Sequence, residues 1–150
     1  MFRFARTFDV VTLFHKPSVP ASQRTLNLLK VAHATATETT TIDQASDNTA
    51  QALRERGEFE LEVTEEPPTP DQLRSILDYA ARADPKQSIS DIVRGAKDAA
   101  DALKKVKENG DNFVRPVTVD WNNGQAVVGD KESVILKMLQ QLPEGENKNQ

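Results

Sequence analysis

The sequence has no cysteine among its 150 residues, and this absence excludes more chemistry than any other feature of its composition. Without a thiolate the chain cannot attack a substrate through sulfur, form a disulfide or ligate an iron–sulfur cluster. Histidine is nearly absent as well, since His15 and His33 are the only two, and we therefore predict no metal site. The lack of cysteine also leaves the redox compartment open.

Apolar and aromatic residues are scarce, at 37% and 5% of the chain, whereas 28% of the residues are charged. So small an apolar share predicts a compact core that is accompanied by a polar insertion or tail. The formal net charge of −4 gives no general attraction to nucleic acid or anionic lipid, and we expect neither as a partner. No apolar run is long enough for a membrane-spanning helix, and the length suits one domain.

The first half of the chain contains two strand-like segments with a helical segment between them. Residues 9–14 form a β-branched and aromatic run, which predicts a strand, and residues 58–64 alternate strictly, which predicts a half-buried edge strand. A helix is expected after the loop that holds Pro17 and Pro20. The predicted inward face of this helix carries Leu26, Leu28, Leu29, Ala32 and His33.

The middle of the chain is polar at first and then strongly helical. Residues 36–57 predict a polar insertion that is flexible over 36–48 and contains a short helix over 49–56. One helix is then expected from Asp71, and a second, continuous helix over 88–107. The predicted inward positions of the second helix are Ile89, Ile92, Val93, Ala96, Ala100, Leu103 and Val106.

The C-terminal part carries a hairpin signal. Strand-like residues 116–121 and 125–128 flank the tripeptide Asn-Asn-Gly at 122–124, and Asn-Gly between two such runs is typical of a tight antiparallel turn. An amphipathic helix is expected over 131–142, and residues 144–150 predict a disordered tail.

The order of the predicted elements, β-α-β-α-β-β-α, fits one mixed four-stranded sheet with helices on both faces. This is the element order of the thioredoxin fold, and we expect a single α/β domain of this type over residues 1–143. The segment DVVTLFHKPSVPASQRTLNLL resembles the strand, loop and helix that carry the active site in thioredoxin-like proteins, most nearly in the arsenate reductase branch. The segments EFELEVTEEPPTPDQLRSIL and VRPVTVDWNNGQAVVGDKESVILKML are similar to a narrower group, the fungal mitochondrial redox proteins of thioredoxin-like fold.

This resemblance implies an oxidoreductase-like function on sulfhydryl groups, with a thiol-containing small molecule or peptide such as glutathione as the ligand, in the mitochondrion. The basic, acid-free residues 1–7 are typical of a transit peptide that is short or uncleaved, and the favoured alternative is an ordinary frayed terminus. The chain departs from the reductase pattern at Val19, which stands where that family has its nucleophilic cysteine and cannot ionise. Arg94 and Arg115 match two of the arginines that hold the family's anion, whereas the third falls at Asp130.

Three residues of the loop before the first helix are candidates for catalysis. Ser18 and Ser22 lie where a nucleophile of this fold would stand, at a helix start, and His15 is the one plausible base near them. Such a trio raises the hypothesis of a hydrolase. The structural alternative is that the serines cap the helix or bind loop backbone, that His15 is tied to backbone at the strand end, and that His33 packs against the core.

A second set of candidates would bind a ligand. The resemblance implies a cis peptide bond between Arg115 and Pro116, which would face the loop over 15–22 and leave a groove for an extended ligand. Four cations are candidates for lining this groove with positive charge, or are otherwise four solvated surface charges: Lys16, Arg24, Arg94 and Arg115.

Two hypotheses for the function therefore remain. In the first, the protein is a mitochondrial redox protein whose substrate supplies all of the sulfur. In the second, the fold persists as a catalytically inactive binding or scaffold module, a pseudoenzyme, and the absence of any thiolate favours this one. Trp121 and Tyr79 are expected to close the edge of the core, and the glutamates over 58–66 to form the wet face of a strand. The sequence makes no prediction of oligomeric state.

Overall fold

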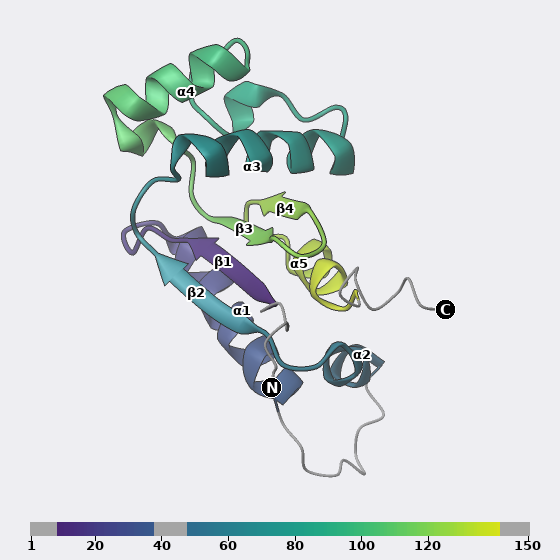
Figure 1. Ribbon diagram of the computed structural model, residues 1–150. Coiled ribbons are helices and arrows are strands. Elements are labelled where there is room, and N and C mark those ends of the chain that lie inside the picture. Colours follow the sequence, from purple (N-terminus) through teal and green to yellow (C-terminus); the bar gives the residue numbers. More distant parts are fainter. Residues whose placement is uncertain (1–8, 38–47, 142–150) are drawn as a thin grey trace, which may run out of the picture.

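The computed structural model describes residues 9–37 and 48–141, and its centre is one mixed four-stranded sheet (Figure 1). The strands lie in the order β2-β1-β3-β4, with β1 parallel to β2, β1 antiparallel to β3 and β3 antiparallel to β4. Their bounds are β1 Val10–Phe14, β2 Glu60–Thr64, β3 Val117–Asp120 and β4 Gln125–Val128. The predicted sheet is confirmed, and β2 is an edge strand as expected.

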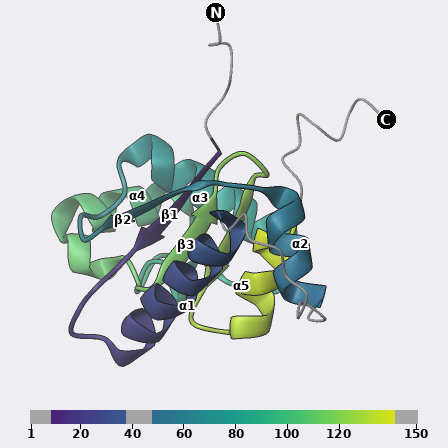
Figure 2. The same ribbon diagram turned by 90° about the horizontal axis from the view of Figure 1, so that it is seen from below.

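Helices cover both faces of this sheet (Figure 1). On one face lie α1 (Pro20–Thr37), α2 (Asn48–Arg56) and α5 (Glu132–Leu139), which stand in front of the sheet when it is seen from below (Figure 2). On the other face lie α3 (Pro70–Ala83) and α4 (Ala99–Glu108), together with short 3-10 turns at Ile89–Asp91 and Gly110–Asn112. No helix in the described ranges has the length and apolar character needed to cross a membrane.

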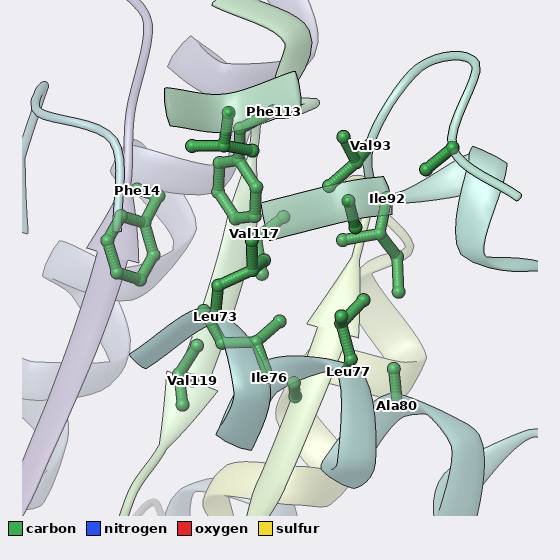
Figure 3. Close-up of a cluster of buried hydrophobic side chains, with 14 residues drawn as sticks. Phe14, Leu73, Ile76, Leu77, Ala80, Ile92, Val93, Phe113, Val117 and Val119 are labelled. Carbon is green, nitrogen blue, oxygen red and sulfur yellow. The ribbon is translucent and has the colours of Figure 1, made fainter. Parts of the chain in front are cut away.

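The alternation of side chains along β1 divides the interior into two cores. Val11 and Leu13 point toward α1, α2 and α5, whereas Phe14 points toward α3 and α4. Figure 3 shows the second core, in which Phe14 packs edge-to-face on Phe113 with ring centroids 5.5 Å apart. The α3 and β3 residues of that core are Leu73, Ile76, Leu77, Ala80, Val117 and Val119. Both faces of the sheet are thereby withdrawn from water at β1 and β3.

The helix expected over 88–107 is interrupted, and this prediction is wrong. Val93 leaves the helical path to form a β-bridge with Phe113, and Gly95 has a φ of +78°, a left-handed conformation that suits glycine. A new helix, α4, then begins behind Asp98, whose side chain accepts a hydrogen bond from the N–H of Asp101. The register changes across the break, so that Ala102 is buried and the predicted Ala100 is exposed.

The inward face of α1 is rotated from the predicted one. Leu29 and Ala32 are buried as expected, but Leu26, Leu28 and His33 are only partly buried. The places at the two ends of the buried face are taken by Ser22, Thr25 and Ala36. Small side chains let α1 lie close to the sheet, while the larger leucines flank the contact.

The polar insertion contains the predicted short helix as α2, and α2 is part of the core because Leu53 is buried beside α1 and α5. The flexible stretch expected over 36–48 lies mostly outside the described residues, as do the basic N-terminus and the predicted tail over 144–150. The hairpin turn is confirmed, with Gly124 at a φ of +63° between β3 and β4.

Candidate functional site

The loop between β1 and α1 is fastened by a buried pair of polar side chains. Ser22 is 0% exposed and His15 5% exposed, and Ser22 Oγ lies 2.6 Å from His15 Nδ1. The same Oγ accepts a hydrogen bond of 2.9 Å from the backbone N–H of Lys16. One hydroxyl therefore binds both residues that follow β1. Because Ser22 is enclosed, its position favours a hydrogen-bonding role in the loop over a role as a nucleophile.

Val19 occupies the junction between the loop and α1. Its carbonyl accepts hydrogen bonds from the N–H groups of Ser22 and Gln23, and its own N–H donates to the carbonyl of Lys16 at 3.0 Å. The side chain at this junction is partly exposed, and the preceding Ser18 is exposed. The position suited to a reactive atom thus carries an aliphatic group that can neither ionise nor accept a proton.

The peptide bond between Arg115 and Pro116 is cis, as the resemblance implied. In the antiparallel register Val117 pairs with Phe14, so Pro116 lies beside the beginning of the loop that carries His15. The Pro116 carbonyl accepts a hydrogen bond of 2.9 Å from Gly129 N–H. The two segments that the sequence predicts to face each other therefore meet at the same end of the sheet.

Arg115 has a different role from the one predicted for it. Its side chain is 4% exposed and lies over the Phe113 ring, with the guanidinium carbon 5.6 Å from the ring centroid. Its Nη1 donates to the carbonyls of Gly110 and Phe113, and its Nη2 donates to the carbonyl of Glu65. Most of the guanidinium is thus used to join the end of β2 to the segment before β3, and burial lowers its pKa.

Three of the predicted cations converge on one residue that the sequence did not single out, Asp111. Lys16 Nζ lies 3.1 Å from Asp111 Oδ1, and Arg115 Nη1 lies 3.7 Å from the same oxygen. Arg94 Nη1 donates to the Asp111 backbone carbonyl at 2.7 Å. The hydrogen bond and charge of Lys16, followed by the charges of Arg115 and Arg94, lower the pKa of the Asp111 carboxyl.

The fourth predicted cation, Arg24, is paired elsewhere. Its Nε and Nη2 both lie 2.9 Å from Asp130 Oδ2, which joins α1 to the turn before α5. The resemblance implied a third arginine at position 130, whereas this chain has an acid there and a basic partner on α1. Lys16, Arg24 and Arg115 therefore lie within 3.7 Å of carboxylates of the same chain, and Arg94 binds a backbone carbonyl.

A second charged cluster, which sequence reasoning missed, lies inside the protein at the opposite end of the sheet. Arg56 is bidentate to both Asp9 and Asp120 at 2.8–3.1 Å, and its Nη1 also donates to the carbonyl of Leu139. The side chains of Arg56 and Asp120 are both 0% exposed. Burial, which lowers the pKa of Arg56, is outweighed by the hydrogen bonds to Asp9 and Asp120, which raise it.

The remaining candidates pack as structural residues. His33 lies edge-to-face on Phe59 at 5.4 Å, and Tyr79 lies edge-to-face on Trp121 at 6.2 Å. Trp121 Nε1 donates to Thr12 Oγ1, which in turn donates to a carboxylate oxygen of Glu62 on the edge strand. Within residues 9–37 and 48–141, no three His, Cys, Asp or Glu side chains are grouped so as to hold a metal ion.

Comparisons with known proteins agree with this architecture. The sequence pattern of one family, described as a protein of unknown function (DUF1687), matches residues 2–130. None of the curated proteins compared with the chain matches it. Among solved structures, an arsenate reductase from Vibrio cholerae is similar, with a TM-score of 0.54, 16% identity, and coverage of 87% of this chain and 98% of the reductase. At this identity the similarity shows the thioredoxin-like fold and leaves the chemistry to the residues.

Proposed function

The chain belongs to the DUF1687 family, and from this premise and its thioredoxin-like fold we propose that it binds sulfhydryl ligands of the glutathione type without exchanging thiols itself. We place it with the fungal mitochondrial redox proteins that its sequence resembles. In this proposal the ligand occupies the groove between the loop over 15–22 and Pro116.

The single observation that carries the proposal is the residue at the loop–helix junction. Thiol–disulfide exchange requires a thiolate that attacks one sulfur and a second sulfur that leaves. Val19 offers neither at the start of α1, and the 150 residues contain no cysteine elsewhere. The hydroxyl of Ser22 cannot substitute for a thiolate, because it is enclosed and already bonded to His15 and Lys16.

The charges beside the loop over 15–22 support a ligand with carboxylates. Glutathione is an extended peptide with two carboxylate groups, and Lys16 and Arg94 present cationic groups beside the loop. Arg115 and Pro116 would shape the floor, since the Arg115 side chain is enclosed and committed to backbone carbonyls. Because Lys16 and Arg94 are partly or fully exposed, we expect modest affinity.

Binding and exchange are tested separately with the full chain. Calorimetry with reduced glutathione is expected to give saturable binding that weakens in Lys16→Met and is unchanged in Lys86→Met, a control in an exposed turn after α3. Absence of binding at millimolar glutathione would overturn the proposal. A glutathione-linked disulfide substrate is expected to react at the uncatalysed rate, and turnover above that rate would instead support a redox enzyme in which the substrate supplies all of the sulfur.

The proposed location has its own test. A fungal cell that expresses the full chain with a C-terminal tag is expected to retain it in the mitochondrial fraction. Recovery in the cytosolic fraction alone would refute the location and leave the binding proposal unaffected.

A further inference from the structure

Asp111 lies at the point where three basic side chains of the candidate site come together. Lys16 comes from the loop after β1, Arg94 from the segment before α4, and Arg115 from the segment before β3. All three approach Asp111, at 3.1 Å for Lys16, 2.7 Å for Arg94 on the backbone carbonyl and 3.7 Å for Arg115. Side chains that are distant in sequence are thus gathered around an acid of the chain itself.

We propose that the Asp111 carboxylate is an internal occupant of this cationic site, so that a carboxylate-bearing ligand binds by displacing it from Lys16. The inference rests on the proposed function, because it concerns how the same groove accepts its ligand. Lys16 cannot pair fully with an incoming anion while its ammonium group lies 3.1 Å from Asp111 Oδ1. An anionic ligand is therefore opposed by competition with the Asp111 carboxylate and not by a side chain that fills the site.

The exposure of the pair makes displacement feasible. The Lys16 and Asp111 side chains are 38% and 65% exposed, and ion pairs that water reaches contribute little to stability. The backbone of Lys16 is fixed by Ser22 Oγ, so its ammonium group can change partners while its Cα stays in place. Arg56 and Asp120, whose side chains are fully enclosed, show the opposite case, a pair that no ligand reaches.

The backbone around Asp111 explains why only its side chain would move. Its N–H donates to Asn109 Oδ1 at 3.0 Å, and its carbonyl accepts from Arg94. These bonds hold the 3-10 turn Gly110–Asn112 independently of the carboxylate. A rotation of the Asp111 side chain would release Lys16 without unfolding the turn.

The test compares Asp111→Asn with the wild-type chain and with Asp78→Asn. Asp78 is a matched control, because it forms an exposed ion pair with Arg82 on α3 and its substitution changes the net charge equally. By calorimetry, Asp111→Asn is expected to bind reduced glutathione about two- to five-fold more tightly than the wild type, the range for the loss of one exposed ion pair. Asp78→Asn is expected to bind as the wild type does.

A second probe separates this inference from the proposed function. Inorganic sulfate is expected to raise the melting temperature of Asp111→Asn more than that of the wild type or of Asp78→Asn. Suppose that sulfate raises the melting temperature of Asp111→Asn most while neither that variant nor the wild type binds glutathione. That result would support the Asp111 carboxylate as the internal occupant and would refute the glutathione proposal. If glutathione binds Asp111→Asn and the wild type equally, or sulfate stabilises all three proteins alike, the internal occupant is refuted.

Discussion

Ser22 Oγ lies 2.6 Å from His15 Nδ1 in a place that solvent does not reach, so this serine and histidine form a tie between α1 and the end of β1. In sequence the same two residues are candidates for a nucleophile and its base. The backbone N–H of Lys16 donates to the same oxygen, so the Ser22 hydroxyl binds two consecutive residues of the loop. The loop geometry of a thioredoxin-like site is therefore maintained here by a hydroxyl group.

Removal of this tie is expected to cost stability. Ser22→Ala leaves the Lys16 N–H and His15 Nδ1 without their partner, and a buried polar group left unsatisfied costs about 1–3 kcal/mol. Urea unfolding of the full chain measures the loss. Ser18→Ala, four residues earlier and exposed, is the control and is expected to change stability by less than about 0.5 kcal/mol. Equal effects of the two substitutions would contradict the structural role of Ser22.

A cysteine placed at the loop–helix junction is expected to be unusually acidic. In Val19→Cys the thiol would lie at the positive end of the 18-residue helix α1, and thiols in such places have pKa values below about 8.5. The pH dependence of alkylation gives the pKa. Ala83→Cys, at the exposed C-terminal end of α3, is the control, and its thiol pKa is expected to lie at or above the ordinary value because this end of a helix is negative. If the two thiols titrate alike, this loop is not the counterpart of the reductase loop.

The Asp111 carboxyl is expected to titrate below the ordinary aspartate value, because Lys16 binds its charged form. A carboxyl whose pKa is lowered by folding contributes stability that is present above its unfolded pKa and is lost as the pH falls through the folded pKa. The Lys16–Asp111 contact should therefore persist at neutral pH and disappear only in acid. Carbon-13 NMR of the side-chain carboxyl gives the midpoint, and Lys16→Met should raise it. An unchanged midpoint in that variant would mean that Lys16 is not the cause.

The buried arginine is expected to be far more important to stability than an exposed one. Arg56→Met leaves Asp120 enclosed without its cation, and breaking a buried pair costs about 3–5 kcal/mol. Arg82→Met, which removes an exposed pair with Asp78, is the control and should cost less than about 1 kcal/mol. Arg56→Lys should fall between them, because lysine keeps the charge but cannot bind two carboxylates bidentately. Urea unfolding of the three variants tests this order.

The sheet was predictable because its signals are local. The strict alternation over 58–64 marks an edge strand, and the Asn-Gly pair before β4 places a left-handed residue where the hairpin needs one. The helix expected over 88–107 fails because periodicity does not reveal the bridge between Val93 and Phe113. Gly95, an isolated glycine within the apolar pattern, was the one local sign of the break.

The arrangement of the candidate cations could not be read from the sequence, which left Lys16, Arg24, Arg94 and Arg115 either as the lining of one groove or as four separate surface charges. In the structure Lys16, Arg94 and Arg115 approach Asp111, whereas Arg24 pairs with Asp130. The sequence did not indicate that the Arg115 guanidinium is enclosed, because the carbonyls that satisfy it come from residues as distant as Glu65. Asp111 stands four residues before Arg115, and this short spacing of an acid and a base is only a weak sequence signal of pairing.

Asp9 sets a limit to how far the chain can be shortened before β1 without loss of a buried charge partner. Asp9 stands one residue before β1 and supplies one of the two carboxylates that neutralise Arg56. A chain shortened by residues 1–8 would keep the Asp9 carboxylate, although its new α-ammonium group would add a positive charge next to Arg56. A chain shortened by one residue more would lose that carboxylate and leave Arg56 with Asp120 alone.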